Sequence, residues 1–63
     1  MPAIWIAIDE SGTVVGASVA EYTEPKLLRE WKERGEKVEL VEAKQITIGA
    51  PLPTDTRVVR IVR

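Results

Sequence analysis

A chain of 63 residues, 44% hydrophobic and 30% charged, has room for one small domain with a marginal core, and its composition excludes a disordered chain. The absence of cysteine and histidine excludes disulfides, thiol or imidazole catalysis and iron–sulfur clusters, and it disfavours zinc. The net charge of −1 is the wrong sign for a non-specific nucleic-acid binder. We therefore expect no cofactor, no metal and no catalytic residue.

The first 20 residues predict a β-hairpin. Three isoleucines alternate with Trp5 and Ala7 over residues 3–8, which is the period-two pattern of a strand. An Asp-Glu-Ser-Gly turn follows, in which Gly12 supplies a positive φ, and residues 13–20 resume with β-branched side chains.

Residues 24–34 predict a helix. Thr23 is placed to serve as its N-cap, and Tyr22 is spaced to pack on Leu27 as a hydrophobic staple. Gly35 is suited to end the helix at its C-terminal side. The predicted apolar stripe consists of Leu27, Leu28 and Trp31.

The rest of the chain predicts strands and one loop. Residues 37–43 alternate as a third strand, 45–48 form a short fourth strand, and 57–62 close the chain as a fifth. Residues 49–56 contain two prolines and are expected to form a loop. We therefore predict one α+β domain over residues 1–63 with the order ββαββ: an antiparallel or mixed sheet of four to five strands with one helix packed on one face. Small phage-encoded inhibitors share a similar order, which is an analogy at the level of the fold.

One helix covers at most one face of such a sheet. We expect the isoleucines of the first strand to face the helix, which leaves the other face uncovered. Two hypotheses account for that face: the C-terminal strands fold back into a small barrel or sandwich, or two copies pack together as a homodimer. We adopt the homodimer. The expected partner or dimer interface consists of Trp5, Ala7, Val41, Val58 and Val62.

The basic residues suggest a second hypothesis, a nucleic-acid surface. The first 25 residues carry a charge of −4 and the others +3. The best candidate contacts are Lys26, Arg29, Arg57 and Arg60. On a regular strand, however, Arg57 and Arg63 face one way and Arg60 the other, so we favour a solvated edge strand protected by arginines.

Two further groups have a structural interpretation beside a chemical one. Asp9 and Glu10 are adjacent carboxylates, but aspartate in a tight turn normally accepts hydrogen bonds from its own backbone, so we predict a turn rather than a cation site. Ser18 has no base available to activate it as a nucleophile.

The segment Pro51, Leu52 and Pro53 has the composition of a presented loop. Two prolines stiffen the chain around the leucine, which lowers the entropy lost on docking. A plain connection between strands explains the same residues, and we prefer that interpretation.

From these observations we expect a non-enzymatic protein-binding or regulatory module that acts through a sheet face or edge. The alternative is a small nucleic-acid-binding protein that uses the basic helix and the last strand. The apolar run near the N-terminus is too short for a signal-peptide core or a membrane span, so we expect a cytoplasmic protein without a membrane partner.

Overall fold

A four-stranded antiparallel sheet and one α-helix make up the protein, whose computed structural model describes residues 2–62. The elements in chain order are β1 (Ala3–Ile8), β2 (Val14–Val19), the 3₁₀ turn η1 (Ala20–Tyr22), α1 (Pro25–Glu33), β3 (Lys37–Glu42) and β4 (Arg57–Val62). The strands lie in the order β2-β1-β3-β4, which confirms the α+β class. The short strand predicted at residues 45–48 is not formed, because this segment belongs to a long loop between β3 and β4.

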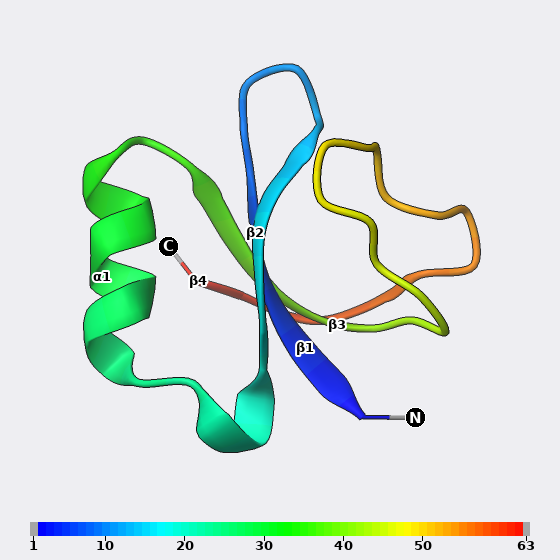
Figure 1. The fold of residues 1–63 in the computed structure, drawn as a ribbon, viewed down its shortest axis with the longest axis horizontal. Helices are drawn as coiled ribbons and strands as arrows, with labels where there is room; N and C mark the ends of the chain where they lie inside the picture. The colour runs from blue at the N-terminus through cyan, green and yellow to red at the C-terminus, as the bar shows by residue number, and fades with distance from the viewer. Residues whose placement is uncertain (1, 63) are drawn as a thin grey trace.

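The sheet separates a helical layer from a loop layer. Figure 1 shows α1 on one side of the twisted sheet and the loop of residues 43–56 on the other. The sheet is open, with β2 and β4 at its edges, so it does not close into the barrel considered from the sequence. The loop takes the place of a second sheet.

The helix packs on the face of β1 opposite to the one predicted. Trp31 is buried in a cluster with Ala7 and Val38, and Trp5 packs at its margin. The physical reason is space: Ala7 pairs with Gly16 across the hairpin, and these two small residues leave room for the indole. A Cβ on Gly16 would lie 2.9 Å from two Trp31 ring atoms, so the ring rests directly on the β2 backbone.

The isoleucines of β1 face the loop layer instead. Ile6 and Ile8 are buried with Val14 and Val41, and Ile4 packs against them. Two half-buried side chains of the loop cover this cluster, and they are Ile46 and Leu52. Two backbone hydrogen bonds hold the loop in place: the Val14 amide donates to the Ala50 carbonyl (2.9 Å), and the Gly49 amide donates to the Val14 carbonyl (2.8 Å).

The helix ends as predicted but begins differently. The Gly35 amide donates to the Lys32 carbonyl (3.0 Å) and the Glu36 amide to the Trp31 carbonyl (3.1 Å), so Gly35, at φ 83°, completes a Schellman motif. At the start, Thr23 is not the N-cap, because its hydroxyl donates to the Val19 carbonyl (2.7 Å) and also pairs with Ser18 Oγ.

The predicted hydrophobic staple is also wrong. Tyr22 ends the 3₁₀ turn, and its side chain points away from the molecule. Glu24 stands at the N-cap position without a capping hydrogen bond from its side chain. The 3₁₀ turn moves the start of the helix by one residue, which breaks the spacing that a staple between Tyr22 and Leu27 requires.

Two β-bulges change which way side chains point. In β2, Ala7 pairs with Gly16 but Ile8 pairs with Val14, which leaves Val15 without a partner. In β4, residues 58 and 60 pair with consecutive residues of β3, which leaves Val59 as the extra residue.

Candidate functional site: the open edge at β4

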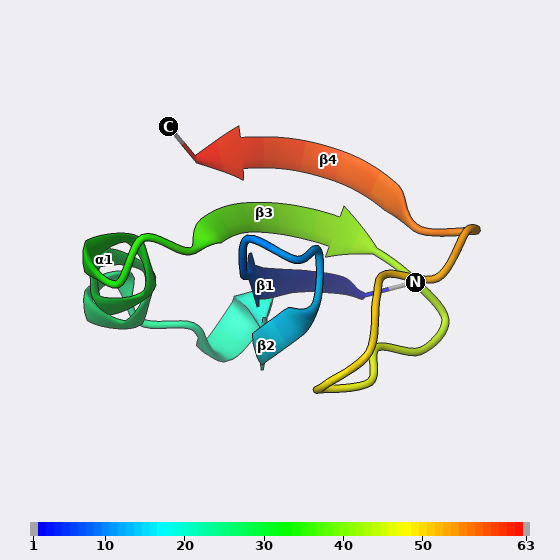
Figure 2. The ribbon, with the colours of Figure 1, turned by 90° about the horizontal axis from the view of Figure 1, so that it is seen from above.

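The outer edge of β4 is the longest open strand edge among the described residues. Its single neighbour in the sheet is β3, and Figure 2 shows it at the rim of the sheet, on the side of β3 away from β1 and β2. Three of its apolar side chains are about half exposed: Val58 (45%), Val59 (50%) and Ile61 (43%). An open strand with such side chains is a template for pairing with another chain.

The bulge at Val59 places both arginines of β4 on one face. Arg57 pairs with Glu42 and Arg60 with Leu40, and residues directly opposite each other share a face. Because Glu42 and Leu40 are two residues apart, Arg57 and Arg60 both lie on the helix side of the sheet. The sequence prediction that they face opposite ways is therefore wrong. Arg63 lies outside the described residues.

The bulge also regroups the apolar side chains of β4. Val58 pairs with Val41 and Ile61 with Glu39, so both lie on the loop side, whereas Val62 pairs with Val38 on the helix side. Regular alternation predicts that Val58 shares a face with Val62, and Val59 with Ile61. One extra residue in the strand accounts for the difference.

The two arginines differ in their electrostatic surroundings. Arg57 Nη1 lies 3.4 Å from Glu42 Oε1, and 79% of the arginine side chain is exposed. Within residues 2–62 no ion pair involves Arg60, which is exposed to solvent. The edge therefore presents apolar side chains on one face and a net positive charge on the other.

The other edge, at β2, is partly covered. The loop bonds to Val14, and an isolated bridge joins Thr13 to Pro51, so the first part of β2 already has a partner on its outer side. Val15 and Val19 are the exposed large apolar residues of this strand, at 38% and 43%. The open part of β2 is shorter than β4 and carries no charged residue.

The interface predicted from the sequence is not one surface. Trp5, Ala7 and Val62 pack in the cluster beneath the helix, and Val41 is fully buried under the loop. Of the five residues, Val58 alone belongs to the exposed large apolar residues. The five residues are separated because the helix packs on the other face of β1 and because the bulge in β4 changes which side chains share a face.

The predicted nucleic-acid contacts are also divided between two places. Lys26 and Arg29 are exposed on α1, on the side of the helix away from its buried Trp31. Arg57 and Arg60 lie on β4 at the opposite edge of the sheet from β2.

The predicted presented loop is a cover for the sheet. Leu52 packs against the core cluster, Pro53 is half-buried and Pro51 is exposed. In the presented-loop interpretation the two prolines present Leu52 to a partner, but in the structure Leu52 packs inward.

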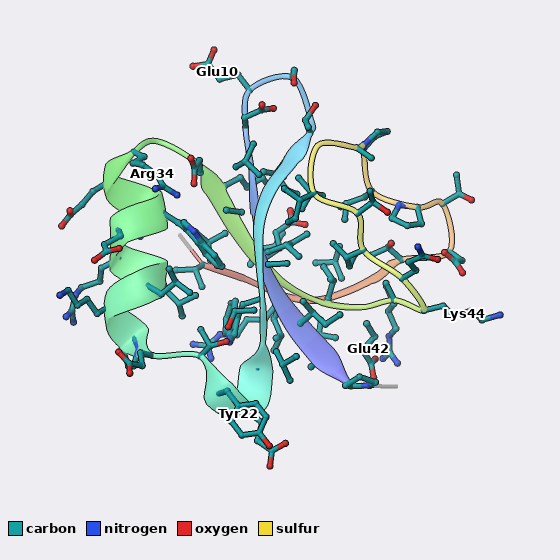
Figure 3. The ribbon with its side chains drawn as sticks, viewed as in Figure 1. Glu10, Tyr22, Arg34, Glu42 and Lys44 are labelled. Carbon is teal, nitrogen blue, oxygen red and sulfur yellow. The ribbon has the colours of Figure 1, made fainter. Side chains whose placement is uncertain are left out.

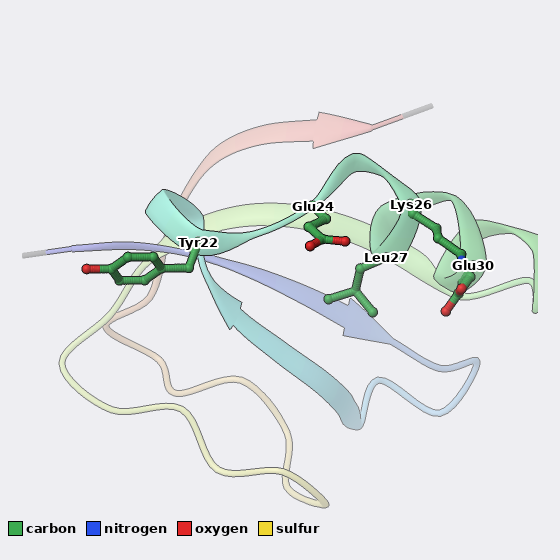
Figure 4. A pocket seen from close by; sticks show the side chains of 5 residues that line it. All are labelled: Tyr22, Glu24, Lys26, Leu27 and Glu30. Carbon is green, nitrogen blue, oxygen red and sulfur yellow. The ribbon is translucent and has the colours of Figure 1, made fainter.

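The helix start borders a shallow depression of about 340 Å³, lined by Tyr22, Glu24, Lys26, Leu27 and Glu30. Figure 4 shows the Tyr22 ring pointing away from the other four side chains. A second depression, of about 390 Å³, is lined by Lys44, Gln45, Thr47, Pro53 and Asp55. Both are open to solvent, and within residues 2–62 no side-chain hydrogen bond joins two of the residues that line either one.

The Asp9 carboxylate organises the turn between β1 and β2. Its Oδ1 accepts hydrogen bonds from the Ser11 hydroxyl (2.6 Å), the Thr13 amide (3.0 Å) and the Ser11 amide (2.9 Å). These donors, the Ser11 hydroxyl first, hold the Asp9 pKa below its ordinary value. Glu10 points outward from the tip of the turn (Figure 3). Within residues 2–62 no three potential metal ligands come together.

Sequence reasoning missed two features that shape this site. The first is Gly16, whose position inside a β-branched run is a signal for close backbone approach. The second is the bulge at Val59, for which the sequence offers no glycine or other marker.

Comparison with known proteins gives no relative: no family model matches the chain, and no match was found among curated proteins or solved structures. In the described part of the chain, no helix has the length and apolar character needed to cross a bilayer.

Proposed function

We propose that this protein is a non-enzymatic protein-binding module that binds its partner by strand addition at β4. The observation that supports this is the open, half-apolar edge of β4 (Figure 2). In strand addition the main-chain hydrogen bonds provide affinity, and side chains on the two faces provide specificity. The homodimer expected from the sequence belongs to the same proposal, since a second copy is one chain that this edge could accept.

The covered sheet faces support the edge as the site. The helix packs on one end of one sheet face. The loop packs on the opposite face, around the β1 isoleucines. The largest exposed apolar group on one element is therefore the β4 triplet of Val58, Val59 and Ile61. Such a group rimmed by charged residues is typical of an interaction site.

Nucleic-acid binding is the weaker alternative. The bulge brings Arg57 and Arg60 to one face, which favours an anionic partner, but Glu42 already pairs with Arg57. Lys26 and Arg29 are on the helix rather than beside these two arginines. Binding through phosphate contacts would weaken steeply with added salt.

The test compares how well variants with one sheet edge blocked capture partner proteins from a nuclease-treated lysate. Lysine on an edge strand disfavours pairing, so the double substitution Val58→Lys and Ile61→Lys should remove the captured proteins. Val15→Lys with Val19→Lys is the matched control, because it changes similarly exposed residues at the other edge. Loss of capture in the control but not in the β4 variant would reject β4 as the site.

A further inference from the structure

We propose that the chain that β4 accepts is an extended acidic peptide whose carboxylates, at alternate positions, face Arg57 and Arg60. This inference rests on the proposed function and names the chemistry of its partner. It follows from three observations on β4: an unpaired backbone edge, the spacing of its arginines and the charge left unneutralised there.

The backbone requires a partner that is itself a polypeptide. β4 runs for six residues, and β3 is its single neighbour within residues 2–62. On the outer side, alternate residues present an N–H and a C=O in the plane of the sheet, with the alternation interrupted at the Val59 bulge. An extended peptide satisfies these groups with its own backbone, whereas a nucleic acid has no matching row of donors and acceptors.

The arginine spacing sets the pattern of the peptide. Arg57 and Arg60 stand opposite Glu42 and Leu40, so in the sheet they are two positions apart. Residues i and i+2 of an added strand would therefore face them on the helix side. The residues between and after these would lie on the loop side, beside Val58 and Ile61. The pattern that fits is acidic, apolar, acidic, apolar.

Charge favours this peptide over a second copy of the chain. β4 contains two arginines and no acidic residue. An antiparallel pair of β4 strands centred on Arg60 sets that arginine against itself. One centred on Val58 sets Arg57 against Arg60 when the bulge residue Val59 is left out of the pairing. Like charges directly opposite each other destabilise a strand pair. A shift of centre to Ile61 avoids both contacts but leaves Arg57 beyond the end of the paired region.

Arg60 is expected to contribute most of the selectivity. Arg57 forms an ion pair with Glu42 at 3.4 Å, whereas no carboxylate of residues 2–62 forms one with Arg60. An incoming carboxylate at Arg60 therefore gains an attraction that does not replace an existing one.

The experiment measures binding of fluorescent six-residue peptides by anisotropy. The probe has the sequence Thr-Glu-Val-Glu-Val-Thr with blocked ends, and the neutral control replaces both glutamates by glutamine. We expect the glutamate peptide to bind about tenfold more tightly at low salt, the size of effect that two cross-strand charge pairs produce. In 0.5 M salt this preference should shrink, because these charges are exposed.

Two sets of variants identify the contacts. Arg60→Gln should weaken binding of the glutamate peptide about three- to fivefold and leave binding of the glutamine peptide unchanged. Arg29→Gln, which removes a cation from the helix, is the matched control and should change neither. Peptides methylated on either the odd or the even backbone nitrogens test the strand pairing, because only alternate N–H groups point at β4: one set should lose binding and the other keep it.

Three results would overturn the inference. If the glutamate and glutamine peptides bind equally and one methylated set fails, strand addition stands and the acidic partner is rejected. If no peptide binds and the chain has twice its monomer mass of about 7.0 kDa, with the dimer lost on the β4 lysine substitutions, the occupant is a second copy. If a single-stranded oligonucleotide binds in an Arg60-dependent way and the peptides do not, strand addition is rejected as well.

Discussion

The Asp9 carboxylate makes the stability of the turn between β1 and β2 depend on pH. Hydrogen bonds from Ser11 and Thr13 favour its charged form, so its pKa in the folded chain lies below that in the unfolded chain. The stability that this carboxylate provides is therefore complete above the unfolded pKa of about 3.9 and is lost as the pH falls through the lower folded value.

Asp9→Asn should accordingly flatten the acid dependence of stability. In urea denaturation from pH 6 to pH 2, the wild type should lose stability below about pH 4 more steeply than Asp9→Asn. Glu10→Gln removes a charge from the same turn but none of the hydrogen bonds to Asp9, so it is the control. An Asp9→Asn curve parallel to the wild type would show that these bonds do not stabilise the turn.

Gly16 is required because the Trp31 ring lies on it. Gly16→Ala places a methyl group 2.9 Å from two ring atoms of a buried side chain, and overpacking of this kind costs about 1–3 kcal/mol. In a Trp31→Phe background the ring is smaller, so the cost of Gly16→Ala should fall. Denaturant midpoints of the wild type, the two single variants and the double variant give the coupling free energy between Gly16→Ala and Trp31→Phe. Strictly additive effects would contradict the contact.

The long loop between β3 and β4 acts as a structural layer. Leu52 packs on the isoleucine cluster, whereas Ile48, in the same loop, is 56% exposed and lies outside the cluster. Leu52→Ala should lower the free energy of unfolding by about 1–2 kcal/mol, below the 2–5 kcal/mol of a fully buried leucine because Leu52 is half-buried. Ile48→Ala, as the matched control, should change it by less than about 0.5 kcal/mol. Equal effects would mean that the loop does not cover the core.

Elements with a clear local signal were predicted correctly. The alternation of residues 3–8, the glycine at position 12 and the glycine that ends the helix each specify backbone geometry locally. Gly12 has a φ of 88°, as the turn requires. Packing across the sheet was predicted less well, since alternation defines two faces of a strand but does not say which one meets the helix.

The errors at the site have the same origin. The larger side chains of β1 were assigned to the helix, but Trp31 needs the small surface that Ala7 and Gly16 provide. The segment at 45–48 has strand-like residues, yet it bends into the loop because Ile46 packs on the core. At Val59 the bulge depends on the pairing of β4 with β3, which no local pattern encodes.

Across the whole molecule, one sheet edge is left to carry an interaction. A chain of this size has little core, and here the helix and the loop use the apolar residues of both sheet faces. The β4 edge combines open backbone, half-exposed apolar side chains and two arginines on one face. Figure 2 shows that neither α1 nor the loop reaches across its outer side.

The most direct test of this account is amide NMR of the labelled protein titrated with the glutamate peptide. We predict that amide signals of β4 shift and that its outward N–H groups become protected from hydrogen exchange, while signals of β2 between residues 16 and 19 stay unchanged. Shifts confined to the helix start or to β2, with β4 unaffected at saturating peptide, would contradict strand addition at this edge.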